Sequence, residues 1–247
     1  MIESNVLDLI EAATQHALGL QAPLAEKLAS VARRITELDP RFAAAVERFI
    51  SRATQAGAGG SAPKPGVPMP SFRLPNQHHQ LVALWDLLAK GPVAIIVIRG
   101  HWCPYCRVQI ADIASVLEDA APLQFVFLSA ETQGHAAPIR SELGGRGHYL
   151  CDTGAGYLLS LGLALWVEDA VAAMLADMGL DVPTYQNGTG WVVPIPALFL
   201  VGQDGIIRAR HVDPDYRRRF DVRASLPWLK QQCAIPPDAT SPPRVTA

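Results

Sequence analysis

Two apolar runs separated by one helical stretch constrain the fold of this chain most strongly. Residues 93–98 (VAIIVI) and 124–129 (QFVFLS) are continuous and rich in β-branched and aromatic side chains, which is typical of parallel strands buried on both faces. Between them, residues 104–117 carry apolar side chains at helical spacing. This pattern predicts a β-α-β unit. It places the sequence RGHWCPYCR (99–107) at the turn from the first strand into the helix.

Cys103 and Cys106 lie in that turn, separated by two residues. A cysteine at a helix N-terminus meets unpaired backbone N–H groups and the positive end of the helix dipole, and both stabilise the thiolate. The spacing puts both sulfurs on one helical face, within reach of a disulfide. A structural zinc site needs four ligands, and the remaining cysteines, Cys151 and Cys233, stand far apart and alone. The pair therefore indicates dithiol redox chemistry rather than zinc or a lone structural disulfide, with no metal and no cofactor.

Composition limits the other classes of function. The chain has 247 residues, 49% of them hydrophobic and 18% charged, with a formal net charge of −2. This balance provides a sizeable core but no strong field to attract nucleic acid or an anionic membrane. We expect no signal peptide, because the N-terminus carries an early acid and no basic, apolar leader pattern. We also expect no membrane span. Four cysteines in a chain of this length do not form a disulfide scaffold. We therefore expect the protein in a reducing cytoplasm.

The chain divides into four parts by pattern. Residues 1–56 read as helices with an amphipathic stripe, and we expect a small helical unit packed on the main domain or against a second copy in a homodimer. Residues 57–71 are dense in Gly and Pro and read as a linker with nothing to bury. Residues 72–233 form the α/β domain, which closes with a hairpin over 196–212 and a final helix. Residues 234–247 read as a frayed tail.

A family resemblance follows from longer motifs. WCPYC resembles the thioredoxin and glutaredoxin active site. The stretch from SFRLPNQ to CRVQI (71–110), followed in order by FLSAET, YLCD and IPALFLVGQDGIIRARHVDPDYRRR, resembles the peroxiredoxin family (alkyl hydroperoxide reductase / thiol-specific antioxidant). It is most similar to the branch that carries C-P-x-C and a helical insert, here residues 162–191. The resemblance implies an α/β thioredoxin-like, peroxiredoxin-type sandwich whose central mixed β-sheet is flanked by helices, preceded by a small helical N-terminal segment.

The resemblance can be carried over residue by residue. Peroxiredoxins read P-x-x-x-T-x-x-C, and an ungapped match puts the peroxide-attacking cysteine at Cys106, the threonine at Cys103 and the proline at Arg99. Gln109 falls on the polar residue three positions past that cysteine. The arginine that helps to bind peroxide falls on Pro196. Proline, threonine and arginine of the peroxide site are thus all replaced.

Several residues near the pair are candidate supporting groups. In thioredoxin-like folds a cis-proline faces the dithiol, and Pro196 holds that place by pattern; the alternative is a trans proline at a strand edge. Arg99 and His101 could favour a thiolate as nearby cations. Trp102 could shield the site or serve as core. The basic run 216–220 reads as a solvated face, with an anion site as the alternative.

Two functions remain open at this point. In the first, a thiol peroxidase, a thiolate reduces the peroxide, the second cysteine resolves the sulfenic acid, and a thioredoxin- or glutaredoxin-type protein reduces the disulfide. In the second, a thiol–disulfide oxidoreductase, Cys103 attacks a protein or small-molecule disulfide and Cys106 releases the product. Similarity to the thioredoxin motif favours Cys103 as the nucleophile, because it is nearer the helix end. The match to the peroxiredoxin motif favours Cys106. A redox-inert or sensing scaffold is the third hypothesis.

Overall fold

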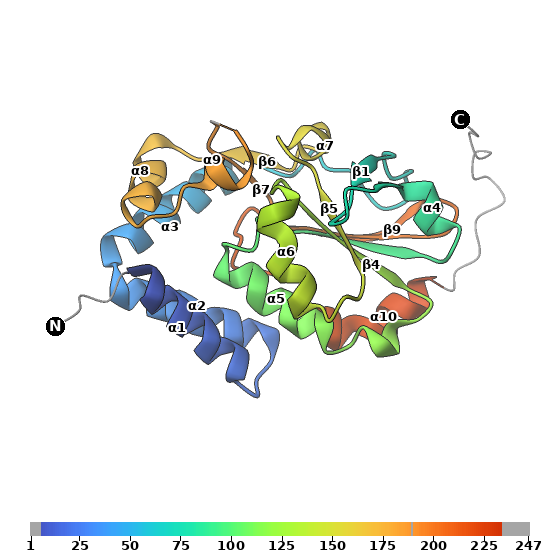
Figure 1. The fold of residues 1–247 in the computed structure, drawn as a ribbon, viewed down its shortest axis with the longest axis horizontal. Coiled ribbons are helices and arrows are strands. Elements are labelled where there is room, and N and C mark those ends of the chain that lie inside the picture. The colour runs from blue at the N-terminus through green and yellow to red at the C-terminus, as the bar shows by residue number, and fades with distance from the viewer. Residues whose placement is uncertain (1–5, 189, 234–247) are drawn as a thin grey trace.

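A five-stranded mixed sheet organises the fold (Figure 1), in the strand order β5-β4-β3-β8-β9. The computed structural model describes residues 6–188 and 190–233. β3 pairs in parallel with β4 and antiparallel with β8. The strands are β3 (Val93–Val97), β4 (Gln124–Ser129), β5 (His148–Cys151), β8 (Ala197–Val201) and β9 (Ile207–Val212).

Helices cover both faces of this sheet, and the central strand β3 is buried throughout. Ala94 and Ile96 face the core that contains α5 and α10, whereas Ile95 and Val97 face the core that contains α4 and α7. The predicted strand buried on both faces is therefore confirmed, as is the thioredoxin-like α/β sandwich. The helices are α4 (Leu84–Leu88), α5 (Pro104–Ala114), α6 (Gln133–Glu142), α7 (Gly156–Ser160) and α10 (Val222–Cys233), and a short hairpin of β1 (Arg73–Pro75) and β2 (Leu81–Ala83) precedes α4.

The N-terminal segment forms three helices, α1 (Val6–Gly19), α2 (Leu24–Leu38) and α3 (Pro40–Gln55). Asp39 separates the last two and its Oδ1 accepts the amide hydrogens of Arg41 and Phe42, as expected for a helix cap. α1 and α2 lie along α5 (Figure 1), and the stripe residues Leu24, Leu28 and Val31 are buried in the same core as α5. The apolar stripe is thus used within the chain.

The insert forms a second cover beside the N-terminal helices. A two-stranded hairpin, β6 (Ala164–Trp166) and β7 (Val192–Pro194), carries α8 (Asp169–Asp177) and α9 (Val182–Tyr185). α3 packs on this insert through a separate small core that includes Phe42, Phe49, Val171 and Leu175. In Figure 1, α8 and α9 lie over α3 at the end of the molecule away from α10. None of the helices in the described residues is long and apolar enough to cross a membrane.

The segment 57–71 differs from the prediction. Rather than a linker with nothing to bury, it packs along β9: the amide of Gly66 bonds to Ile207 O at 2.8 Å and that of Met69 to Gly205 O at 2.9 Å. Ala62 and Met69 are buried in the sheet core. Gly and Pro here shape a fitted path along the edge strand instead of a free tether. The expected tail, 234–247, lies outside the described residues.

Candidate active site

The cysteine turn connects the end of β3 to the start of α5, as the sequence predicts. Cys103 occupies the N-cap position and Pro104 the first turn of the helix, where a proline loses no hydrogen bond. The amide of Cys106 bonds to Cys103 O at 3.0 Å. Gly100 makes the turn possible, because its φ is +146° and a Cβ there would lie 2.6 Å from Trp102 Nε1.

The Cys106 sulfur is buried and surrounded by donors. It accepts the backbone N–H of Arg99 at 3.3 Å and the Nη2–H of Arg219 at 3.3 Å. Arg219 also donates from Nη1 to Gln109 Oε1 at 2.9 Å, which fixes the guanidinium on the sulfur. Gln109, a predicted supporting residue, thus lies near Cys106 and is linked to its sulfur through Arg219, which was not predicted.

These contacts shift the pKa values of the two thiols in opposite directions. Burial acts to raise the pKa of Cys106, but the hydrogen bond from Cys103, the charge of Arg219 and the Arg99 amide together bring it well below the ordinary value. Burial raises the pKa of Cys103, and its hydrogen bond and proximity to the Cys106 charge raise it further. The pair therefore shares one proton and one negative charge, with the thiolate on Cys106 and the thiol on Cys103.

Arg99 supplies a second cation beside the pair. Its guanidinium carbon lies 4.0 Å from the ring centre of Tyr216 and 4.8 Å from that of Trp102, both cation–π contacts. Tyr105 packs edge-on against Tyr216, with ring centres 5.3 Å apart. Trp102 thus holds a charged side chain next to Cys103 and also lines the pocket above it.

A buried carboxyl lies behind the turn. Glu131 follows β4, and its Oε2 accepts hydrogen bonds from the His101 amide at 2.9 Å and the Tyr149 hydroxyl at 3.1 Å. Burial, together with the nearby Cys106 charge, raises the pKa of Glu131 to about 8 against these hydrogen bonds, which act to lower it. The imidazole of His101 bonds to Glu142 at 3.1 Å rather than to either sulfur.

The prediction of a cis bond before Pro196 is wrong. Among the described residues the cis peptide bond is Ala121–Pro122, so Ile195–Pro196 is trans. β7 runs on in extended form toward β8, and the amide of Ile195 bonds to Leu163 O at 2.8 Å in the hairpin of the insert. Pro196 does not line the pocket above Cys103. The backbone N–H of Ile195 is consequently not free to pair with an incoming substrate.

The other cysteines lie apart from this chemistry. All four are free thiols. Cys151 is buried in β5, and burial raises its pKa to about 12. Cys233 ends α10, and burial raises its pKa to about 11. Within residues 6–188 and 190–233, no group of three His, Cys, Asp or Glu side chains is arranged to hold a metal ion.

Two groups of the site were not predicted from the sequence. Arg219 lies in the basic run that reads as a solvated face, yet its side chain turns inward onto Cys106. Glu131 had a recognisable signal, because it lies two residues after a buried parallel strand, at the sheet edge where the cysteine turn also lies. Arg219 thus brings a guanidinium to the dithiol from the segment after β9, whereas the family match places its arginine at Pro196.

A dithiol at a strand-to-helix turn, with a thiolate held by an arginine, defines a thiol oxidoreductase of the thioredoxin fold. A sequence model of the AhpC/TSA family matches residues 65–210. The chain belongs to this peroxiredoxin-like family of the thioredoxin fold.

Individual relatives are distant. The thiol:disulfide interchange protein DsbE of Pseudomonas aeruginosa is 26% identical over 174 residues, covering 70% of this chain and 79% of that protein. The peroxidoxin BcpB of Mycobacterium tuberculosis has a similar fold, with a TM-score of 0.53 at 17% identity, covering 68% of this chain and 97% of that one. A peroxiredoxin-like protein of Aquifex aeolicus gives a TM-score of 0.52 at 11% identity, over 70% of this chain and 90% of that one.

Proposed function

We propose that the protein is a thiol peroxidase that reduces a small-molecule hydroperoxide by cycling Cys103 and Cys106 between dithiol and disulfide. The observation that carries this proposal is the Arg219 guanidinium on the Cys106 sulfur. It stabilises the negative charge of the dithiol on Cys106, and that charge reaches Cys103 when the Cys103 proton passes to the Cys106 sulfur.

Access to the pocket supports different roles for the two cysteines. Cys103 lines the pocket that opens toward solvent, whereas Cys106 does not. Cys103 therefore attacks the outer oxygen after its proton passes along the existing hydrogen bond to the Cys106 sulfur. The O–O bond breaks, Cys103 becomes a sulfenic acid, and the other oxygen leaves as the anion and takes up a proton. Cys106 then attacks the Cys103 sulfur, forming the disulfide and releasing water after protonation.

Burial argues for a small substrate. Cys103 is 1% exposed and Cys106 is 0% exposed, and the backbone N–H of Ile195 is already paired within the chain. A disulfide on a protein surface would therefore meet no exposed cysteine sulfur on this chain. A hydroperoxide is small enough to reach Cys103 through the pocket.

Electrons return by exchange with a dithiol protein of the thioredoxin or glutaredoxin type. We infer that this cycle runs in a reducing cytoplasm, since cysteine usage fits that compartment. We also propose a homodimer, because proteins of this family commonly form dimers. Because the α2 stripe is buried within the chain, the dimer contact must use another surface. Sedimentation of the full chain tests this point.

The second candidate is thiol–disulfide exchange, favoured by the relative named as a thiol:disulfide interchange protein. A rapid-mixing comparison separates the two functions. Reduced protein is mixed with cumene hydroperoxide, with hydrogen peroxide, with a small aromatic disulfide and with an oxidised protein substrate. The peroxidase proposal expects hydroperoxide reduction far faster than by a free thiol. Fast reaction with either disulfide, together with a hydroperoxide rate equal to that of a free thiol, would favour the second candidate instead.

A further inference from the structure

The buried carboxyl of Glu131 has no partner of opposite charge. Glu131 is 0% exposed, and in the part of the chain that the structure describes it forms no salt bridge. Its Oε2 accepts hydrogen bonds from the His101 amide, the Tyr149 hydroxyl and, at 3.4 Å, the Ser129 hydroxyl, whereas its Oε1 has no partner there. A buried carboxylate without a cation is costly, so the carboxyl favours its neutral form.

The same short stretch of backbone binds Glu131 and the Cys106 sulfur. The amide of Arg99 donates to Cys106 Sγ at 3.3 Å, and that of His101, two residues on, donates to Glu131 Oε2 at 2.9 Å. Burial first, and the Cys106 charge as a smaller cause, raise the pKa of Glu131 to about 8. Two negative charges in one buried site repel each other. The reduced site therefore carries its negative charge on sulfur while Glu131 stays protonated at neutral pH.

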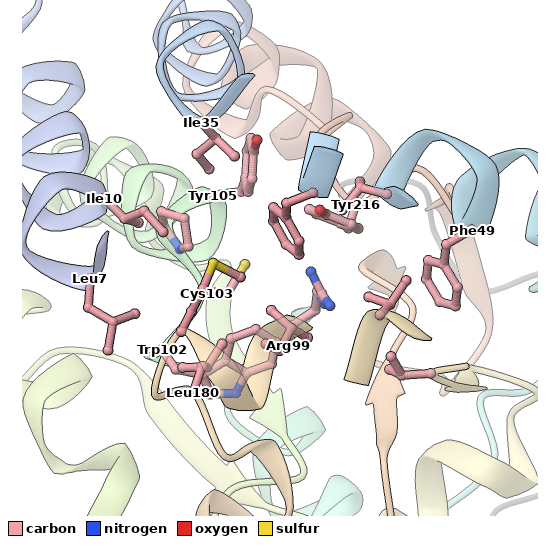
Figure 2. Close-up of a pocket in the computed structure, with 17 residues that line it drawn as sticks. Leu7, Ile10, Ile35, Phe49, Arg99, Trp102, Cys103, Tyr105, Leu180 and Tyr216 are labelled. Atoms are coloured by element: carbon pink, nitrogen blue, oxygen red, sulfur yellow. The ribbon is translucent and has the colours of Figure 1, made fainter. Parts of the chain in front are cut away.

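An unused donor lies on the other side of the turn. Trp102 lines the pocket together with Cys103 (Figure 2), but its Nε1 is buried and has no partner among the described residues. A Cβ built on Gly100 would lie 2.6 Å from Trp102 Nε1 and 2.8 Å from Glu131 Oε1, so the two unpaired atoms border the same small space. An indole N–H only donates, and its proximity therefore favours the ionised form of the carboxyl.

These contacts give Glu131 a role in the redox cycle. We propose that Glu131 stores one proton for the dithiol: it is protonated while Cys106 is a thiolate, and it gives up that proton when the Cys103–Cys106 disulfide forms. The negative charge of the site thus moves from sulfur to carboxylate. This coupling applies to any two-electron oxidation of the pair, whereas its use in peroxide reduction rests on the proposed function.

The atoms of peroxide reduction balance with this store. Two electrons pass from the sulfurs to the peroxide, the O–O bond breaks and the S–S bond forms. The alcohol and the water that leave carry three hydrogens on oxygen. One comes from the hydroperoxide, one from the Cys103 thiol and one from Glu131. When a dithiol protein reduces the disulfide, its two hydrogens return to Cys103 and Glu131, and its own sulfurs form a disulfide.

The other titratable groups that face Glu131 keep their protons. On β5, burial raises the pKa of Tyr149 well above its ordinary value and that of Cys151 to about 12. On α9, burial also raises the pKa of Tyr185. Of these four side chains, Glu131 is therefore the one whose protonation changes near neutral pH.

The reduction potential of the dithiol, measured against pH, tests the coupling without peroxide. The full chain is equilibrated with dithiothreitol buffers of known potential, and the free thiols are counted by alkylation. Uptake of one proton changes the equilibrium constant tenfold per pH unit, or about 30 mV, and uptake of two changes it a hundredfold, or about 59 mV. We expect the steeper dependence in the native protein over an interval that ends near pH 8, and the shallower one in Glu131→Gln.

Glu142→Gln is the matched control. Glu142 on α6 pairs with the His101 imidazole at 3.1 Å and with Arg107 at 3.4 Å, so it is a carboxyl near the same turn with cationic partners of its own. This variant should keep the steep dependence of the native protein. Equal slopes in the native protein and Glu131→Gln, or the same loss of slope in both variants, would overturn the proposal.

Infrared difference spectra of the native full chain report the carboxyl directly. At pH 7 we expect the band of a protonated carboxyl in the reduced protein to disappear on oxidation with a small aromatic disulfide, and to be missing from Glu131→Gln. A band that is unchanged by oxidation would remove the proton store and leave the peroxidase function standing. Loss of the band in a protein that reduces hydroperoxides no faster than a free thiol would support the store and refute the peroxidase function.

Discussion

Arg219 holds the charge on Cys106, and its removal should therefore raise the pKa of the dithiol. The guanidinium is half-buried and donates to the sulfur at 3.3 Å. A hydrogen bond to a charged group contributes about 1.5–3 kcal/mol, and one pKa unit corresponds to about 1.4 kcal/mol. Arg219→Ala should thus raise the thiolate pKa by about 1–2 units. Arg219→Lys keeps the charge but not the fork that also bonds to Gln109, so it should raise the pKa by a smaller amount.

The assay is the ultraviolet absorbance of the thiolate followed against pH, with the alkylation rate as a second readout. Cys151 and Cys233 do not interfere near neutral pH, because burial raises their pKa values to about 12 and about 11. Arg218→Ala is the matched control: Arg218 lies in the same turn, but its side chain is 73% exposed and pairs with Asp213 and Asp215. An unchanged pKa in Arg219→Ala, or an equal rise in Arg218→Ala, would refute the assigned role of Arg219.

Three further predictions follow from the site and the fold. Because burial raises the pKa of Glu131 from 4.5 to about 8, its contribution to stability is complete below pH 4.5 and is lost as the pH rises through 8; the gap corresponds to about 4–5 kcal/mol at most. Denaturant unfolding at several pH values should therefore show a flatter profile for Glu131→Gln, and an unchanged slope would contradict this. Peroxide oxidation should give an intramolecular Cys103–Cys106 disulfide in peptide mapping without reductant, and a dominant link to Cys233 would be inconsistent with the geometry. Leu28→Ala should lower the free energy of unfolding by about 2–4 kcal/mol in a single transition, because Leu28 is 3% exposed and shares a core with α5; a separate early transition would mean that the N-terminal helices unfold independently.

Local pattern was sufficient to predict much of this architecture. The run at 93–97 became a central strand because β-branched side chains on both faces require two covers, and α4 and α5 provide them. The start of α2 lies at Pro23 and the boundary between α2 and α3 at Asp39 and Pro40, residue types whose backbone and side-chain chemistry acts within a few residues. The position of the dithiol followed from the same local rules.

Tertiary contacts account for the remaining features. Arg219 reaches Cys106 across 113 residues of sequence, and no periodicity in a basic run indicates which of its members turns inward. The bond before Pro196 is trans, and the neighbouring Ile195 amide bonds to Leu163 in the insert, a contact that no local pattern around Pro196 indicates. The pocket likewise exists only because helices α1 to α3 dock over the cysteine turn.

The central claim is that Cys103 attacks the peroxide and Cys106 resolves the product. The most direct test is mass spectrometry of Cys106→Ser after one equivalent of an organic hydroperoxide, with a reagent that traps sulfenic acids, alongside Cys103→Ser treated in the same way. The account predicts a trapped sulfenic acid on Cys103 in the first variant and little or no adduct on Cys106 in the second, because Cys106 does not line the pocket. A dominant adduct on Cys106 in Cys103→Ser, with none on Cys103 in Cys106→Ser, would contradict it.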